Sequence, residues 1–348
     1  MRSTMLIAAA TASRPDRTHG IYPIMKVCIF GAGAIGGHLA ARLPAAGADV
    51  SVVARGEHLA AIQQNGITLE LPDRTLRARV KASANPGDLG AQDAVIVTVK
   101  APALPDVAAR IAPLLRADTP VLFAMNGIPW WYFHAHGGPF DGRRLPLLDP
   151  GDALWRAIGP QRPLGGVVYS SNTVTAPGVV RCVSGRMHII LGEPSGPKSN
   201  RALALADLIN TSGAKAEASE RIRDDIWTKL LANISSNPLT FLAQTTLGAV
   251  FAEPACVAAV RKVAGEAASI ARALGCDVDL DVDKAFAGAQ AHKPSIVQDL
   301  ERGRPLEIDA MFTVPAEFGK MLDVPTPMLD LMVTLMKLRA RAAGLYPA

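Results

Sequence analysis

The chain has 348 residues, of which 49% are hydrophobic, and a mean hydropathy of +0.20, so it is long and apolar enough to fill the cores of two domains. Its formal net charge of +5 comes from basic residues that are spread along the chain without a basic stripe among aromatics, which argues against a nucleic-acid partner. No apolar run is long enough to span a bilayer, so we expect no membrane partner. The four widely separated cysteines show neither metal-ligand spacing nor a disulfide framework. We therefore expect a cytoplasmic protein with reduced thiols and no metal.

The first 24 residues differ from the rest of the chain. Residues 6–12 form a short apolar run that faintly resembles a signal peptide, but the run leads into Arg14 and Arg17 without a clear cleavage context. Met25 directly precedes the first expected strand. We therefore predict that residues 1–24 are a disordered N-terminal extension.

Residues 26–30 are apolar and predict a buried parallel strand, which is followed by a glycine-rich turn and then by apolar residues at helical spacing. A strand, this turn and a helix, with a second strand at residues 50–54, are typical of a dinucleotide-binding unit. The alternative is a purely structural glycine turn. We expect the cofactor to contact the turn at the helix N-terminus, through Gly31, Ala32, Gly33, Ala34, Ile35 and Gly36.

The end of the second strand predicts which dinucleotide binds. An NAD site usually has a carboxylate there to hold the ribose hydroxyls, but this chain has Ala54-Arg55-Gly56. The guanidinium of Arg55 can pair with a 2′-phosphate instead. We therefore predict NADPH as the cofactor, with a solvated surface arginine as the alternative reading of Arg55.

The following segments add polar residues at two further strand ends. We expect a helix at residues 57–65, a hairpin of residues 67–71 and 76–80, and a buried strand at 93–99. A helix is expected to follow Lys100-Ala-Pro102 and to run through Leu115, and a further strand is expected at 120–124. Lys100 and Asn126 directly follow the two buried strands. Ligands of open α/β sheets bind beyond the carboxyl ends of the strands, so both residues are expected in one crevice with Gly31 and Arg55.

An aromatic segment, residues 128–148, begins with Trp130-Trp-Tyr-Phe133 and continues through His134 and His136. Two histidines suggest a metal site, but no third ligand with clear spacing accompanies them. We interpret the segment as an aromatic flap over the crevice or as an interface patch.

The remaining sequence changes from strands to helices near Ser219. Strands are expected at residues 165–171, 179–183, 187–191 and 214–218, with a helix at 201–211. Helices are then expected at 224–236, which we predict to end at Asn237-Pro238, and at 253–274, 284–287, 309–322 and 326–343. The predicted fold class is α/β, with a Rossmann-type dinucleotide-binding domain at residues 25–219 and an all-α helical domain at 220–348.

One predicted helix carries three polar residues on a single face. Lys229, Asn233 and Asn237 are spaced four residues apart, beside an apolar face. A lysine and two amides in line suit a site that binds an oxygen-rich anion, because asparagine lowers helix propensity and needs a reason to be there. The alternative is a solvated polar face.

A second group of polar residues lies near the C-terminal end of the sequence. Ser295 precedes a short expected helix and could cap it or donate to a carboxylate. Glu307 opens another expected helix, where a negative charge suits the helix dipole. On spacing alone, each residue can equally well have only the structural role.

The chain resembles the ketopantoate reductases (2-dehydropantoate 2-reductases) from Met25 to about Leu345. The resemblance rests on GAGAIGG, the Arg55 position, VTVKAP, the MNG around Asn126, IWTKLLANISSNPLT and KPSIVQDLERGRPLEIDA. It implies NADPH-dependent reduction of a 2-oxo acid in a cleft between a Rossmann domain and a helical domain. Ketopantoate is the default substrate, and pantothenate synthesis is the default role.

The resemblance also implies the roles of individual residues. Lys229 would be the catalytic lysine and Glu307 the acid of the site, while Arg55 and Lys100 would serve the nucleotide or the cleft. Substrate-binding roles fall to Asn126, Asn233, Asn237 and Ser295. In this reading, Lys229 donates a proton to the ketone oxygen on which charge develops.

Two alternative functions remain at this point, and the oligomeric state is open. The bulky residues 129–148 depart from the short segment of the better-known family members, so a different 2-oxo acid is one alternative. A catalytically silent NADPH-binding sensor is another, although the Lys229 face argues against it. A homodimer formed through the helical domain is compatible with the sequence, which does not establish the oligomeric state.

Overall fold

The computed structural model describes residues 24–288 and 291–347, and within these residues ten strands form one sheet. The strand order is β4-β3-β9-β8-β7-β6-β1-β2-β5, and β10 pairs with β9. The neighbours from β5 to β8 are parallel, whereas β8 and β9 are antiparallel. The strands are β1 Lys26–Phe30, β2 Asp49–Val53, β3 Ile67–Glu70, β4 Thr75–Ala78, β5 Lys81–Ser83, β6 Ala94–Val97, β7 Val121–Ala124, β8 Pro163–Ala176, β9 Val179–Gly192 and β10 Lys215–Ser219.

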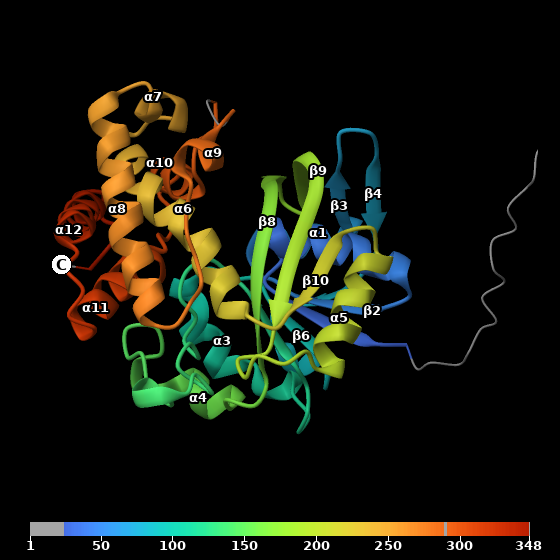
Figure 1. The fold of residues 1–348 in the computed structure, drawn as a ribbon. Helices are drawn as coiled ribbons and strands as arrows, with labels where there is room; N and C mark the ends of the chain where they lie inside the picture. Colours follow the sequence, from blue (N-terminus) through green and yellow to red (C-terminus); the bar gives the residue numbers. More distant parts are fainter. Residues whose placement is uncertain (1–23, 289–290, 348) are drawn as a thin grey trace, which may run out of the picture.

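Helices surround this sheet and form the whole C-terminal part of the described chain (Figure 1). Those within the sheet region are α1 Ala34–Arg42, α2 Gly56–Asn65, α3 Leu104–Arg110, α4 Ala153–Ile158 and α5 Asn200–Thr211. Those after the sheet are α6 Ile222–Ala243, α7 Leu247–Phe251, α8 Pro254–Ala273, α9 Val282–Phe286, α10 Ser295–Glu301, α11 Val314–Met321 and α12 Pro327–Ala342. The predicted fold class, an α/β sheet domain followed by a helical domain, is confirmed.

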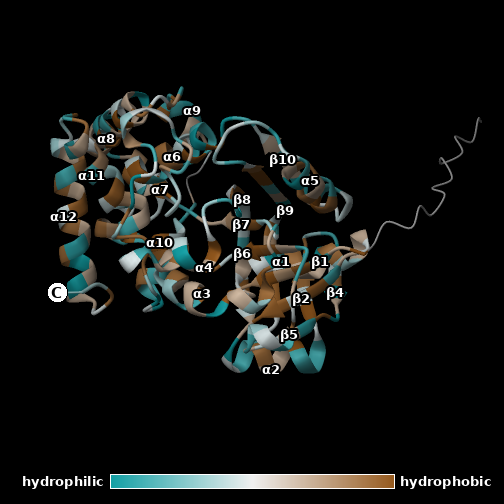
Figure 2. Ribbon diagram, turned by 90° about the horizontal axis from the view of Figure 1, so that it is seen from below, coloured by the Kyte–Doolittle hydropathy of each residue, from teal (hydrophilic) through white to brown (hydrophobic). Residues whose placement is uncertain are grey.

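Each face of the sheet packs against its own core, because side chains alternate along a strand. In β1, Val27 and Ile29 belong to the core that includes residues of α1 and α5. Cys28 and Phe30 point to the other face, whose core continues through α3 into α6 and the later helices. This second core joins the sheet to the helical part, and hydrophobic colouring runs through the central strands in Figure 2.

The aromatic segment is part of the second core, which contradicts its interpretation as a flap or an interface patch. Trp130, Trp131, Tyr132 and Phe133 are at most 2% exposed. Tyr132 accepts a hydrogen bond from Trp227 Nε1 of α6 at 2.8 Å. The segment is apolar because it fills the space between the sheet and the helices, which the sequence pattern alone did not indicate.

Several predicted boundaries are wrong. Helix α6 does not end at Asn237-Pro238 but continues to Ala243. Pro238 has no backbone N–H and so costs the helix one hydrogen bond, but the burial of the surrounding residues stabilises the helix by more than that loss. The strands expected at 179–183 and 187–191 are a single strand, β9. It pairs antiparallel with β8, and each of the two strands has 14 residues. The helix expected between Pro102 and Leu115 is divided, and only Leu104–Arg110 is α-helical.

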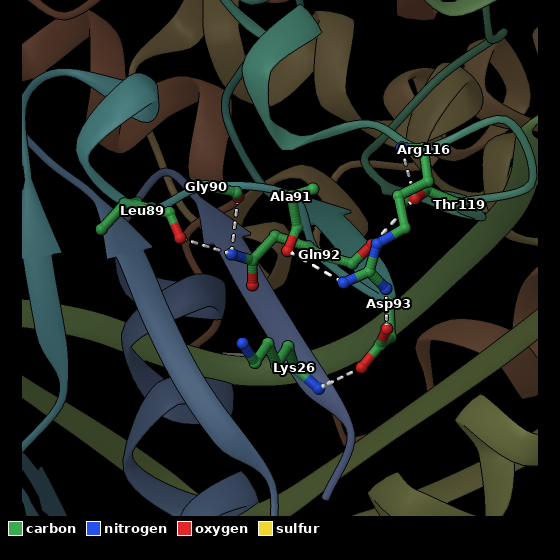
Figure 3. A network of polar contacts seen from close by, with 8 residues as sticks. All are labelled: Lys26, Leu89, Gly90, Ala91, Gln92, Asp93, Arg116 and Thr119. Atoms are coloured by element: carbon green, nitrogen blue, oxygen red, sulfur yellow. Dashed lines mark hydrogen bonds and ion pairs between the residues drawn. The ribbon is translucent and has the colours of Figure 1, made fainter. Parts of the chain in front are cut away.

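The amino ends of β1, β6 and β7 are tied together by polar contacts (Figure 3). Asp93 accepts from the Lys26 backbone N–H at 2.8 Å and pairs with the Arg116 guanidinium. Thr119 donates to the Gln92 carbonyl at 2.8 Å. These contacts hold the amino ends of the three strands together. The candidate site lies at the other end of the strands, beyond their carboxyl ends.

Two further expectations concern the chain as a whole. The predicted disordered extension, residues 1–24, lies outside the described residues except for Ile24, which is exposed. In the portion that the structure describes, no helix combines the length and apolar character needed to cross a membrane.

Candidate active site

The glycine turn lies between the carboxyl end of β1 and the first turn of α1. Gly31 has φ +103°, a conformation that favours glycine, and a Cβ at Gly36 would lie 2.0 Å from Gly31 O. Gly36 therefore allows the helix to approach the turn closely. A Cβ at Gly33 would meet no described atom within 4 Å, so the backbone there faces open space. These features fit the pyrophosphate of a dinucleotide, which needs close backbone approach and free N–H groups.

Arg55 lies at the carboxyl end of β2, beside the glycine turn in the sheet. Gly31 N–H donates to Val53 O at 3.0 Å, and Arg55 follows two residues later at the start of α2. The side chain is exposed and forms no hydrogen bond with the described residues.

Lys229 reaches from α6 to the carboxyl end of the sheet. Its Nζ donates to Asn126 Oδ1 at 2.7 Å and also contacts the Val168 carbonyl of β8. The ring of Tyr169 lies 5.5 Å from the same ammonium group. Burial lowers the pKa of Lys229 to about 8, and the nearby Glu307 carboxylate opposes that shift. A lysine with this pKa is charged at neutral pH and can release its proton readily.

Glu307 lies on the other side of Asn126. Its Oε2 accepts from Asn126 Nδ2 at 3.4 Å, and its Oε1 accepts from the Ala101 backbone N–H at 3.3 Å. Burial raises the pKa of Glu307, whereas these hydrogen bonds and the Lys100 charge stabilise its ionised form. Asn126 therefore joins the lysine and the acid through a single amide group.

Lys100 forms an ion pair that the sequence analysis missed. Its Nζ lies 2.5 Å from Asp299 Oδ2 of α10, so the pair joins a strand end to the helical part. Asp299 is buried, and a buried carboxylate needs a partner of opposite charge. Asp299 is one of four polar or charged residues in the short helix α10, so its sequence context does not set it apart.

The other predicted substrate-binding residues lie less centrally. Asn233 and Asn237 share α6 with Lys229, and Asn237 is buried, whereas Asn233 is partly buried. Ser295 is the first residue of α10, is exposed, and forms no hydrogen bond with the part of the chain that is described. Of the two readings of Ser295, the structural one as a helix cap is not met, since Pro294 takes that position.

A small apolar cavity of about 20 Å³, which has room for about one water molecule, adjoins Asn126. Phe123, Ile128, Trp130 and Ile226 form part of its lining. The aromatic segment thus contributes a buried wall beside the site. Within the described residues, no three histidine, cysteine, aspartate or glutamate side chains form a group that could hold a metal ion.

Comparison with protein families gives two matches that together cover most of the chain. Residues 27–136 match the model described as ketopantoate reductase PanE/ApbA, and residues 221–340 match the model of the C-terminal part of the same family. Both the glycine turn and Asn126 lie in the first match, and Lys229 and Glu307 lie in the second.

Individual proteins show the same likeness. A 2-dehydropantoate 2-reductase of Mesorhizobium japonicum is 46% identical over 92% of this chain and all of its own length. A crystal structure from Ralstonia solanacearum, provisionally described as a ketopantoate reductase, is 40% identical, covers 93% of this chain and all of its own, and has a TM-score of 0.87. D-mandelate dehydrogenase in complex with NADH and anilino(oxo)acetate is 23% identical with a TM-score of 0.77, covering 92% of this chain and all of its own, and shares the fold.

Proposed function

Because the chain belongs to the ketopantoate reductase family and is an NAD(P)-dependent oxidoreductase, we propose that it reduces ketopantoate to pantoate with NADPH, in the synthesis of pantothenate. The observation that carries this proposal is the ammonium group of Lys229, held by Asn126 at the carboxyl edge of the sheet. That edge is where open α/β sheets bind their ligands.

The residues of the site account for the proton that the reaction consumes. A bound nicotinamide dinucleotide would supply the hydride that a 2-oxo acid accepts at its carbonyl carbon. Negative charge then develops on the ketone oxygen, and Lys229 Nζ stabilises that charge and donates a proton to it. The neutral Lys229 amine regains a proton from solvent before the next turnover.

The surrounding side chains act on Lys229 and on the substrate. Asn126 accepts a hydrogen bond from Lys229 Nζ and restricts the direction of the ammonium group. This lowers the entropic cost of orienting the proton donor toward the substrate. The Glu307 carboxylate favours the charged form of Lys229. Asn233 and Asn237, on the same face of α6, orient the substrate without adding charge, and Ser295 would complete its binding.

NADPH is proposed over NADH because Arg55 occupies the position where an NAD site usually has a carboxylate. The guanidinium can pair with a 2′-phosphate through two N–H groups. The turn at Gly33 is open to a pyrophosphate, as such a cofactor requires.

The test is the oxidation of NADPH by the purified protein with ketopantoate and with a panel of aliphatic and aromatic 2-oxo acids, with NADH in parallel. We expect the highest kcat/KM for ketopantoate with NADPH. Turnover that strongly favours another 2-oxo acid would contradict ketopantoate as the substrate but would leave the proposed reduction chemistry in place. Binding of NADPH without turnover of any acid would favour a sensor.

A further inference from the structure

Side chains from two distant segments donate hydrogen bonds to carbonyl oxygens of the glycine turn. Thr98, which follows β6, donates from Oγ1 to Gly31 O at 2.6 Å. His58 of α2 contacts Ala32 O through Nε2. The other ring nitrogen of His58 accepts from Gly178 N–H at 2.9 Å, so Nε2 is the protonated nitrogen and donates to the turn.

A third carbonyl is held by the partly buried Asn172, which is linked to the buried His38 and Arg42. Asn172 of β8 donates from Nδ2 to Ala34 O at 3.2 Å, and its Oδ1 lies 3.2 Å from His38 Nδ1. Arg42 donates from Nε to His38 Nε2 at 2.8 Å. His38 Nε2 is therefore an acceptor, Nδ1 carries the proton, and the amide of Asn172 can face the turn in only one way. Burial lowers the pKa of His38 to about 4, which keeps its ring neutral.

These contacts, together with the first turn of α1 in the case of Ile35, set the direction of three N–H groups. A trans peptide is planar, and its N–H points away from its C=O. The carbonyls of Gly31, Ala32 and Ala34 belong to the same peptide groups as the N–H groups of the residues that follow them. The donors hold these carbonyls against the protein, so the N–H groups of Ala32, Gly33 and Ile35 are directed away from those donors.

The space available at the turn agrees with this orientation. A Cβ on Gly33 would meet no described atom within 4 Å, in contrast to Gly36, where it would lie 2.5 Å from Thr98 Oγ1. The turn is therefore packed where the side chains hold its carbonyls and open at Gly33. A phosphate requires N–H donors and close approach of the backbone at the same place.

We propose that Thr98, His58 and Asn172 are positioning residues that hold three carbonyls of the glycine turn, so that the adjoining N–H groups face the pyrophosphate of the dinucleotide. This inference rests on the proposed use of a nicotinamide dinucleotide. The glycine pattern alone does not predict this contribution to cofactor affinity. The three donors lie 21 or more residues beyond the turn in sequence.

The experiment measures the Kd for NADPH by fluorescence titration without any 2-oxo acid. Thr98→Val and His58→Phe each remove one donor at similar side-chain volume, and His58→Gln restores a donor and an acceptor. The matched control is Gln63→Leu, because Gln63 also lies on α2 and donates to a backbone carbonyl, that of Ala82, away from the turn. We expect the Kd to rise about tenfold for each of the two removals, and His58→Gln to recover most of the loss.

Steady-state kinetics separates positioning from a general loss of structure. The KM for NADPH is expected to rise in Thr98→Val and His58→Phe, while kcat at saturating NADPH stays near that of the unaltered protein, as does the melting temperature. Unchanged Kd values in both variants, beside normal binding by the unaltered protein, would overturn this inference alone. Failure of the unaltered protein to bind either NADPH or NADH would overturn both the inference and the proposed function.

Discussion

Lys229 combines a charge with a partly buried position, and this combination determines how it responds to pH. Burial brings its pKa to about 8, and only the protonated form can donate to a ketone oxygen. We therefore predict that kcat for reduction falls as the pH rises through about 8. The measurement is kcat between pH 6 and pH 10 at saturating substrates, for which about five buffers of equal ionic strength suffice.

A matched variant identifies the group responsible for that decline. The Glu307 carboxylate raises the pKa of Lys229, so Glu307→Gln should shift the alkaline limb of the kcat profile to lower pH. An alkaline limb at an unchanged pH in Glu307→Gln would show that Lys229 is not the titrating group or that Glu307 does not act on it.

Arg55 is predicted to determine the preference for NADPH. Because the side chain is exposed, Arg55→Ala should fold normally and raise the KM for NADPH by about tenfold or more, through loss of a charge-assisted hydrogen bond. The KM for NADH should hardly change. Arg79→Ala, at another exposed arginine, is the control, and equal changes in the two KM values would contradict the prediction.

Single residues show both the reach and the limit of sequence reasoning about the site. Lys229, Asn126 and Glu307 were expected in one place and are joined by hydrogen bonds in the structure. Asp299 was missed, because its importance comes from the ion pair with Lys100, a residue 199 positions away in the chain. Such a pair has no periodicity or local spacing that a sequence pattern could reveal.

At the scale of elements, the strand, turn and helix at the start of the fold assign different tasks to two glycines. Gly36→Ala would place a Cβ 2.0 Å from Gly31 O, so we predict a loss of about 1–3 kcal/mol in the free energy of unfolding. Gly33→Ala meets no such contact among the described residues and should fold normally, yet weaken NADPH binding about tenfold, because its methyl group occupies the approach of the phosphate.

Urea unfolding and NADPH titration of both variants provide the measurements. Each variant serves as the control of the other, since both introduce the same methyl group three residues apart. Normal cofactor affinity in Gly33→Ala would contradict the placement of the pyrophosphate at the turn.

The elements predicted correctly are those with a strong local pattern. The hairpin of β3 and β4 and the buried strands β1, β6 and β7 were all expected from alternation or from apolar runs. The end of α6 was predicted wrongly because a proline normally interrupts a helix, whereas this one lies in a segment whose burial sustains the helix. The position where α6 ends depends on packing against the rest of the fold, which local sequence patterns do not reveal.

At the scale of the whole molecule, the sheet and the C-terminal helices share one core. The aromatic segment lies within that core, and the indole N–H of Trp227 in α6 donates to Tyr132 Oη. The sequence predicted the aromatic residues as a functional surface, since it does not reveal which apolar segment fills the space between two parts of a fold.

This shared core predicts that the two parts unfold together. Trp131→Ala should lower the free energy of unfolding by about 3–5 kcal/mol, because it leaves a large void in the core. Far-UV circular dichroism and tryptophan fluorescence should report the same midpoint in urea, for the unaltered protein and the variant alike. Two separated transitions in the unaltered protein would contradict a core that unites the parts.

The central claim is that Lys229 donates the proton in the reduction of a 2-oxo acid. Its most direct test is the kcat of Lys229→Ala at saturating NADPH, with the 2-oxo acid that the unaltered protein reduces fastest, beside the Kd for NADPH. We predict that kcat falls about 100-fold or more while the Kd stays near its original value. A Lys229→Ala protein that binds NADPH and turns over at a near-normal kcat would contradict the account.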